Sequence, residues 1–281
     1  MGAGTLFISV LSFLLALTIG QNLGFRNPFI VLLFCIWIVS FISFLYLELH
    51  VLHPMIDLHI FRNSLFSLNL FTGFITFVAT AGVVLLMPFY LENILGYSPH
   101  QVGFLLATVP ISAGIASPIS GIMSDRFGSR SISTVGLALM TIGFFSLTTL
   151  NSDTTAFGYI LRFLPVGLGI GTFQSPNNSA IMGAASKKYL GVVSGLLSIS
   201  RTLGQTAGIA TIGAFWASRV SFYAAGEFAT GPTRTNIDAQ VHGLTDALSA
   251  IVILIALGLF LNIWGLMLNW LRDSTTSPSK S

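Results

Sequence analysis

The sequence contains little charge and a single cysteine. Only 7% of its 281 residues are charged and 53% are hydrophobic, whereas a soluble domain carries about 25% charged residues. A chain this apolar cannot cover itself with polar surface, which excludes a soluble globular protein and indicates a protein that lies in lipid. The lone Cys35 excludes a disulfide framework and a cysteine-based metal motif.

Positive charge is also scarce. The 12 basic residues give a net charge of +3, and they are too few and too scattered for a nucleic-acid-binding surface. They fit the basic cytoplasmic loops of an inner-membrane protein instead. Residues 1–25 carry no charge at all. The basic first region of a signal peptide is therefore missing, and we expect this stretch to be a membrane span.

Long apolar runs without charge make up most of the chain. A membrane-spanning helix needs about 20 such residues, and eight runs approach or exceed that length: 5–21, 30–47, 66–90, 101–123, 133–150, 159–182, 190–216 and 247–271. The sequence therefore predicts an all-α, polytopic membrane protein with about eight transmembrane helices. Prolines inside the runs predict tilted or kinked helices; they are Pro88, Pro110, Pro118, Pro165 and Pro176.

The basic residues between the spans predict the orientation. With a cytoplasmic N-terminus, seven of them lie on the cytoplasmic side and three on the outer side, as the positive-inside rule requires. The seven are Arg62, Arg126, Arg130, Lys187, Lys188, Arg272 and Lys280, and the three are Arg26, Arg219 and Arg234. We therefore expect a multi-pass protein of the cell inner membrane with both termini in the cytoplasm.

Residues 48–62 join the second and third spans. From residue 55 to residue 61 they alternate between apolar and polar, which predicts a linker that lies on the inner leaflet. The linker contains His50, His53 and His59. No metal-binding spacing or nearby cysteine accompanies them, so we expect solvated histidines and neither a metal nor a cofactor.

The turn after the fourth span carries the charged motif GIMSDRFGSR at residues 121–130. Gly121 permits close backbone approach and Gly128 permits the positive φ of a tight reversal. Asp125, Arg126 and Arg130 are placed to pair with each other or with a helix terminus. These five residues resemble the inner-loop signature of major facilitator carriers, which joins the second and third helices of a six-helix half. The alternative is an ordinary charged turn.

Further residues narrow the resemblance. Residues 48–62, with HPMIDL at 53–58, resemble the linker of the fourteen-span drug:proton antiporters of the EmrB/QacA type. The sixth and seventh spans resemble this group through Gly167, Gly169, Gly171, Gln174, Pro176, Asn177, Gly191, Gly195, Arg201, Gly204 and Gly208. The resemblance implies that residues 1–62 are two extra transmembrane helices and a linker, and that residues 63–281 are the C-terminal six-helix half of a major facilitator fold.

The same resemblance implies efflux of drugs or other lipophilic compounds by proton antiport and alternating access. The six N-terminal helices of the family, which usually hold the proton-exchanging acidic residue, have no counterpart in the sequence. We therefore expect transport to need an N-terminal half or a second subunit as a partner, besides the lipid bilayer, a small lipophilic substrate and protons.

Two other classes of protein stay open. One is a nonfunctional or regulatory membrane fragment. The other, less favoured, is an intramembrane enzyme, which would need paired acids, an activated nucleophile or metal ligands at membrane depth. We expect no enzyme, because the predicted spans contain no Asp, Glu or His.

Two arginines within the predicted spans are candidates for substrate binding or proton coupling. Arg201 lies near the middle of the seventh span, where it is either a functional charge or a tie between helices. Arg162 enters the sixth span near its outer face, where it can snorkel to water. By resemblance to the arginine-and-glycine motif on the fourth helix of antiporters, Arg162 could instead take part in coupling.

Amides and small residues complete the candidates. Gln174, Asn177 and Asn178 are three and four residues apart, so we expect them on one inward helix face. They either line a substrate cavity, which we favour, or bond to a neighbouring helix. The pairs Gly191/Gly195 and Gly204/Gly208 predict close helix packing.

Overall fold

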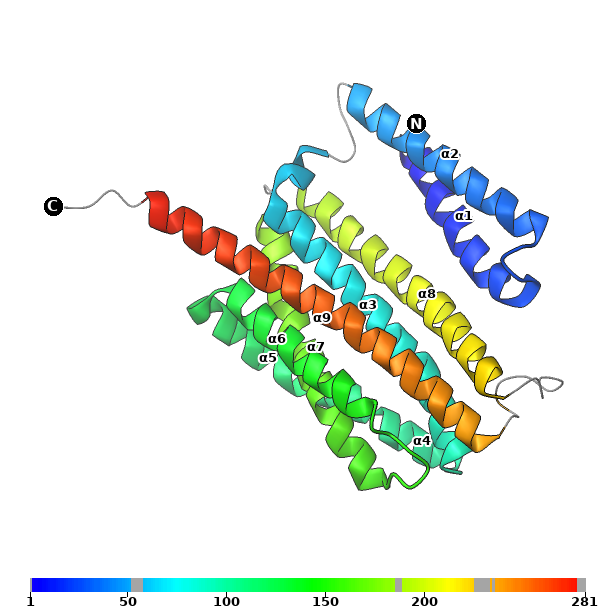
Figure 1. Cartoon of the computed structure of the whole chain (residues 1–281). Helices are drawn as coiled ribbons and strands as arrows, with labels where there is room; N and C mark the ends of the chain where they lie inside the picture. Colours follow the sequence, from blue (N-terminus) through cyan, green and yellow to red (C-terminus); the bar gives the residue numbers. More distant parts are fainter. Residues whose placement is uncertain (1, 52–57, 185–188, 225–232, 234–235, 277–281) are drawn as a thin grey trace.

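The computed structural model describes residues 2–51, 58–184, 189–224, 233 and 236–276 (Figure 1). In these ranges the chain forms helices and no strands, which confirms the predicted all-α fold. The elements are α1 (Gly2–Leu23), α2 (Pro28–His50), a 3-10 helix (Leu58–Arg62), α3 (Ser64–Phe89), a π-helical turn (Tyr90–Ile94), α4 (Pro99–Leu106), α5 (Thr108–Phe127), α6 (Ser129–Leu147), α7 (Ala156–Gly183), α8 (Leu190–Tyr223) and α9 (Ile237–Thr276).

Six stretches of these helices are long and apolar enough to cross a membrane: Pro28–His50, Ser64–Ile94, Pro99–Phe127, Ser129–Leu147, Ala156–Gly183 and Ile237–Met267. α1 holds a shorter apolar helix, Gly4–Gly20. α8 has 34 residues, but Arg201, Gln205 and several serines and threonines lower its hydropathy. With α1 and α8 the eight predicted helices are all present, and the protein is a multi-pass membrane protein.

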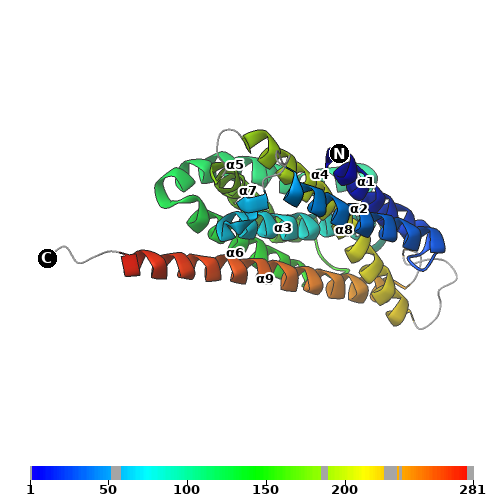
Figure 2. The same ribbon diagram turned by 90° about the horizontal axis from the view of Figure 1, so that it is seen from above.

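Six of the seven α-helices described after residue 62 form two packed groups of three, and the short α4 contacts both groups. One group is α3, α8 and α9, and the other is α5, α6 and α7. The groups are joined where α6 packs against α9 and where α3 contacts α7. The α1–α2 hairpin packs only lightly on α8 and lies to one side of the other helices (Figure 1 and Figure 2). The membrane bundle is therefore built from helices 64–276, with the hairpin as an addition to its flank.

Apart from α4 and α5, which follow one another along one span, successive helices run in alternating directions, so the connections gather at two ends of the molecule. The start of α1, the turn between α5 and α6 and the end of α9 lie at one end, which we call the signature end (Figure 1). The connections between α1 and α2 and between α6 and α7 lie at the opposite end. This arrangement places both ends of the helical part of the chain on the same side of the bundle.

Small residues allow the helices of each group to approach closely. A Cβ atom on Gly136 of α6 would lie 2.8 Å from Phe173 Cα on α7, and a Cβ on Gly208 of α8 would lie 2.9 Å from Val78 Cα on α3. Real Cβ atoms do not come so close to another backbone, so only glycine fits at either position. The resulting short interhelical distances are typical of membrane helix packing, where interfaces are rich in small residues.

Two of the prolines break the helices that contain them. Pro110 has no N–H to bond the carbonyl of Leu106, and the helix is interrupted at Ala107. The predicted fourth span is therefore two helices, α4 and α5. Pro88 is followed directly by the π-helical turn, in which Leu95 N donates to Tyr90 O at 3.1 Å. The other three prolines lie inside α5 and α7 without ending them.

Several helices extend beyond the predicted spans and take acidic residues with them. α9 begins at Ile237 rather than at residue 247, so Asp238 and Asp246 are helical. α2 continues to His50, and Glu48 near its end is only 7% exposed. The predicted boundaries of these two spans are therefore too short, because acidic residues and histidines near the helix ends are helical as well. Polar residues near the helix ends interrupt the apolar runs, so the sequence predicts loops where the helices continue.

Candidate functional site

The turn between α5 and α6 is made at Gly128, whose φ is +84°. Gly128 ends α5 and begins α6, and this left-handed conformation is one that L side chains rarely adopt. Asp125 and Arg126 in the last turn of α5 are exposed, and within the described part of the chain neither forms an ion pair. Gly121 faces α7, because a Cβ there would lie 3.5 Å from Ser175 Oγ.

Arg130 differs from the other two charged residues of the motif, because its side chain turns inward onto α9. Its Nε, Nη1 and Nη2 are buried and have no hydrogen-bond partner among the described residues. The guanidinium lies directly over Gly265, whose missing side chain leaves the space that it fills. One turn deeper, Thr134 Oγ1 lies 2.7 Å from Asn262 Oδ1. The predicted signature therefore divides into an exposed pair and one buried arginine.

The three amides of α7 do not share one surface. Asn177 is 2% exposed and faces α3, where a Cβ on Gly73 would lie 3.2 Å from its Nδ2. Its Oδ1 has no hydrogen-bond partner in the part of the chain that the structure describes. Gln174 and Asn178 are half-buried. Adjacent residues point about 100° apart on a helix, which separates Asn177 from Asn178 although both lie three or four residues from Gln174.

Arg201 lies on an exposed face of α8. Its guanidinium carbon is 5.2 Å from the centre of the Phe77 ring, a cation–π geometry. Ser198, Thr202 and Gln205 are exposed on the same face of α8. The four residues form a polar stripe along the middle of an otherwise apolar bundle, and we call it the α8 stripe. The arginine that the sequence analysis singled out is thus on the surface of the described chain rather than in its core.

The two glycine pairs of α8 have different surroundings. Gly204 packs on α3, since a Cβ there would lie 2.9 Å from Phe77 Cβ, and Gly208 packs one turn further along the same helix. A Cβ on Gly191 or Gly195 would meet no described heavy atom within 4 Å. Close helix packing is therefore present at the second pair, while at the first pair it stays a prediction.

Arg162 is tied to the connection at the opposite end of the bundle. Its Nε donates to Thr149 Oγ1 at 2.9 Å, and its Nη1 donates to Gly158 O at 3.0 Å. Ser146 Oγ donates to the carbonyl of Arg162 at 3.1 Å. These bonds hold the start of α7 against the end of α6, which gives Arg162 a structural task at the end of the helix.

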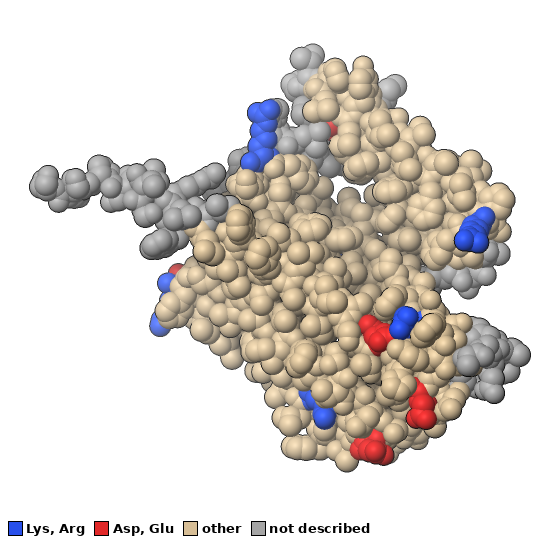
Figure 3. Space-filling view, in the orientation of Figure 1, with Lys and Arg blue, Asp and Glu red and all other residues tan. Residues whose placement is uncertain are grey.

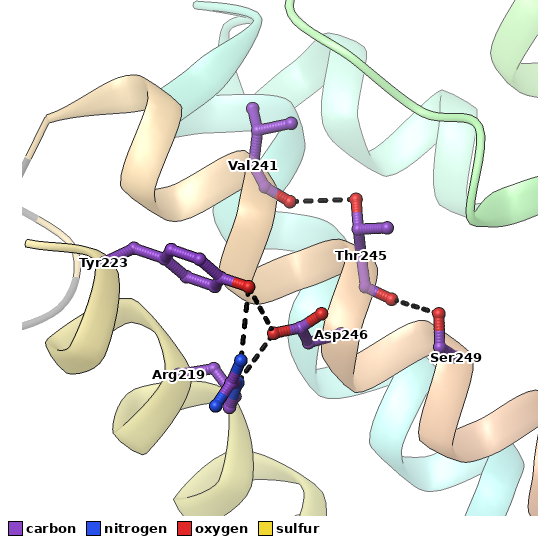
Figure 4. A network of polar contacts seen from close by, with 6 residues as sticks. All are labelled: Arg219, Tyr223, Val241, Thr245, Asp246 and Ser249. Atoms are coloured by element: carbon purple, nitrogen blue, oxygen red, sulfur yellow. Dashed lines mark hydrogen bonds and ion pairs between the residues drawn. The ribbon is translucent and has the colours of Figure 1, made fainter.

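A polar network that the sequence analysis missed joins α8 to α9 (Figure 4). Arg219 Nε donates to Asp246 Oδ2 at 2.6 Å, and Tyr223 Oη donates to the same oxygen at 3.0 Å. Arg219 Nη2 also donates to Tyr223 Oη at 3.1 Å. This network was not predictable from the sequence, because residues 218–245 have the composition of one polar loop. It fastens the two helices together at the opposite end of the bundle.

An apolar cavity of about 360 Å³ separates the α1–α2 hairpin from the bundle. Aromatic and aliphatic side chains from α1, α2, α3 and α8 line it, among them Phe13, Trp37, Phe44, Phe74, Leu196 and Leu203. Figure 3 shows the hollow between the hairpin and the bundle, on a face of the molecule that carries few charges. The cavity can hold an apolar group but offers little to orient a polar one.

The side chains of two of the three linker histidines lie outside the described residues. His53 is outside the described residues, and the side chain of His59 is outside them too. His50 Nδ1 lies 2.8 Å from Tyr46 O on the preceding turn of α2. Within the described ranges no group of three or more His, Cys, Asp or Glu residues could hold a metal ion.

Comparison with known proteins matches residues 1–209 to the Major Facilitator Superfamily. The chain is 29% identical over 219 residues to the multidrug transporter protein MdtP of Bacillus subtilis, covering 78% of this chain and 40% of that protein. It is 30% identical over 188 residues to the riboflavin transporter RibZ of Clostridioides difficile, covering 66% and 41%. It is 28% identical over 218 residues to the quinolone resistance protein NorB of Staphylococcus aureus, covering 77% and 47%.

The chain therefore spans less than half the length of each of these relatives. The family match covers about three quarters of the chain and includes the motif at residues 121–130, the amides of α7 and Arg201. Together with the helical, lipid-compatible fold, it shows that this chain belongs to the major facilitator superfamily of membrane transporters.

Proposed function

We propose that the protein exports lipophilic compounds in exchange for protons, as a member of the fourteen-span drug:proton antiporter group. In this proposal residues 63–281 are the C-terminal six-helix bundle, and residues 1–62 are two extra helices and their linker. The protein lies in the cell inner membrane with both termini in the cytoplasm. Similarity to a multidrug transporter and to a quinolone resistance protein supports this substrate class, and membership of a transporter family supports transport rather than catalysis.

The observation that carries the proposal is the α8 stripe. A charged side chain exposed to lipid in the middle of a membrane helix is costly, and such residues almost always face a bundle interior or a water-filled cavity. Arg201 and Gln205 are exposed on the described chain. The α8 stripe therefore faces a second helical bundle or a water-filled path between two bundles. Gln174 and Asn178 of α7 add further half-buried amides that fit such a path.

Alternating access in this type of transporter needs two bundles that rock around a central site. The described helices provide one six-helix bundle and the hairpin. The α8 stripe itself carries no carboxylate or histidine, and an arginine cannot release its proton at working pH. We therefore place the proton-exchanging carboxylate on an N-terminal half or a second subunit, whose contact surface includes the α8 stripe.

The test is an accumulation assay in efflux-deficient bacteria that produce this chain together with the N-terminal half of a fourteen-span relative. We expect Arg201→Gln to reduce the export of ethidium, a lipophilic cation, at least about tenfold at an equal protein level, because a charged contact is worth roughly 1.5–3 kcal/mol. Arg26→Gln is the matched control, because Arg26 is an exposed arginine at the α1–α2 connection.

Two results would count against the proposal. If Arg201→Gln and Arg26→Gln export ethidium equally well, the α8 stripe does not line the path. If the paired halves transport riboflavin but not ethidium or other lipophilic cations, the substrate class is wrong. The riboflavin measurement is included because a riboflavin transporter is among the relatives.

A further inference from the structure

The apolar cavity between the α1–α2 hairpin and the bundle is elongated, and we call it the hairpin slot. Its lining residues run along three of the helices, over residues 6–13 on α1, 37–45 on α2 and 196–203 on α8. The helical rise over these stretches makes the slot about 10–12 Å long and parallel to the helices. Its volume of about 360 Å³ lies within the range of small-molecule sites.

The hairpin slot lies within one leaflet of the membrane. α1 and α8 begin at the signature end and α2 ends there, and the lining residues of these helices lie within about 20 Å of that end. Half of a bilayer with its headgroups is about as thick, and the hydrocarbon of one leaflet measures about 15 Å. Phe13 and Trp37, whose ring centres are 4.7 Å apart, lie at the deep end of the slot.

A second hollow connects the hairpin slot with the lipid-facing surface. It also measures about 360 Å³, and the two share the lining residues Phe61, Phe74, Leu196, Ile199 and Leu203. Its wall continues to Phe71 of α3, which is 49% exposed. A long flexible molecule can therefore enter the slot sideways from the membrane without passing through the bundle.

The α8 stripe faces away from the hairpin slot. On α8 the slot is lined by Leu196, Ile199 and Leu203. Each of these residues is followed two positions later by a residue of the stripe, namely Ser198, Arg201 and Gln205. Two positions turn a helix by about 200°, so the slot and the stripe lie on opposite sides of α8. A second bundle that contacts the stripe therefore leaves the slot free for a ligand.

The lining of the hairpin slot suits an uncharged alkyl chain. Except for Ser9, which is 1% exposed, the lining side chains are aliphatic or aromatic. A lipophilic cation would leave its charge unpaired there, which is costly in an apolar site. An empty slot would leave the lining side chains without partner atoms on one side, although van der Waals contacts are a main attraction between helices in a membrane.

We propose that the hairpin slot binds one acyl chain of a phospholipid from the leaflet at the signature end. The chain lies parallel to α8 with its methyl end at Phe13 and Trp37, while the headgroup stays at the membrane surface. The bound chain packs the hairpin onto the bundle, where direct contact between the two is light. The slot recognises the chain by its shape and apolar surface, so the headgroup contributes little to binding.

The test uses the fluorescence of Trp37, which bromine atoms quench on contact. In the purified full chain phenylalanine replaces the other three tryptophans, Trp216, Trp264 and Trp270. The protein is kept in a steroid-based detergent without long alkyl chains and is titrated with phosphatidylglycerol whose acyl chains carry bromine near the methyl end. We expect the quenching to saturate as a single site. The same lipid with bromine near the carboxyl end should bind equally well but quench Trp37 less, and phosphatidylcholine with the same chains should bind with similar affinity.

A second tryptophan and two valines provide the controls. A chain whose only tryptophan is Trp264, which is 56% exposed on α9, should show quenching that rises with the lipid content and does not saturate. Val10→Phe adds bulk to the wall of the hairpin slot and should lower the affinity measured at Trp37 at least about tenfold. Val31→Phe makes the same change on α2 at a position that is 48% exposed and outside the slot, and it should leave the affinity unchanged.

Each other outcome overturns the proposal. Quenching of Trp37 that does not saturate, or no quenching at all, would show that the hairpin slot holds no acyl chain. Unchanged affinity in Val10→Phe would place the lipid outside the slot. Reversal of the quenching by tetraphenylphosphonium, a lipophilic cation, would make the slot a site for a cationic substrate. A preference of at least about tenfold for phosphatidylglycerol over phosphatidylcholine would make the headgroup the recognised part. The titration with the unaltered hairpin stays decisive if Val10→Phe fails to fold.

Discussion

Replacing Gly208 by alanine tests the packing that holds α8 against α3. The new Cβ would lie 2.9 Å from Val78 Cα and even closer to the carbonyl oxygen of Val78. Both of these atoms belong to the backbone of α3, so a rotamer change cannot relieve the clash and the helices have to move apart. Gly204 lies one turn earlier on the same contact, so the separation would also loosen its packing on Phe77.

The cost follows from the geometry. Adding a methyl group to a tightly packed interior typically costs about 1–3 kcal/mol. A change of this size lowers the unfolding temperature by on the order of 5 °C in a protein of this length. The matched control is Gly195→Ala on the same helix, where the new Cβ meets no described atom within 4 Å. Alanine is the better helix former by up to about 1 kcal/mol, so the control should be neutral or slightly stabilised.

The assay is thermal unfolding of the purified chain in detergent, followed by tryptophan fluorescence, with both variants measured in parallel. The packing argument predicts a lower unfolding temperature for Gly208→Ala only. It would be refuted if Gly208→Ala unfolded at the temperature of the unaltered chain. Equal destabilisation by Gly195→Ala would show that the first glycine pair also packs against a surface, which the described residues do not provide.

Three further predictions concern the turns and the ends of the bundle. Gly128→Ala should lose about 1–3 kcal/mol of stability, because its φ of +84° strains any L side chain. Gly103→Ala, at a helical position with open space around it, is the control and should lose none. If the two variants unfold at the same denaturant concentration, Gly128 is not strained by a side chain. A double-mutant cycle on Arg219 and Asp246 should give a small coupling that weakens as salt is added, since their side chains are 32% and 31% exposed. A coupling that added salt leaves unchanged would mean that the pair is shielded from water. A reporter fused after Asp153, in the connection between α6 and α7, should read outside the cell; a cytoplasmic signal would reverse the proposed orientation.

The helical architecture was predictable because it depends on apolar runs. In lipid, the backbone N–H and C=O groups of an apolar stretch must bond to each other, because no water is present. A helix forms all of these bonds within the stretch, so an apolar run predicts a helix. The same reasoning failed where helices contain polar residues. Residues 237–246 include Asp238, His242 and Asp246, which read as loop, yet they begin α9 and bring Asp246 to Arg219 on α8.

The sequence predicts which residue types the site contains, but not the directions in which their side chains point. Gly128 was found because a tight reversal requires a residue that tolerates positive φ. Arg130 was expected to pair with the other charges of the turn or with a helix terminus, since the sequence contains no sign of the space above Gly265 that lets it turn inward. Spacing placed Asn177 beside Asn178, but which of the two faces α3 depends on helix rotation, and that is set by packing at positions such as Gly73.

The central claim is that this chain supplies one bundle of a proton-coupled exporter. The direct measurement is export of a lipophilic cation from proteoliposomes under an imposed pH gradient, first with this chain alone and then with an N-terminal half of a fourteen-span relative added. The account predicts no gradient-driven transport by the chain alone and its appearance when both halves are present. Robust transport by the isolated chain would contradict it and would require a proton-exchanging group and a second bundle from the chain itself.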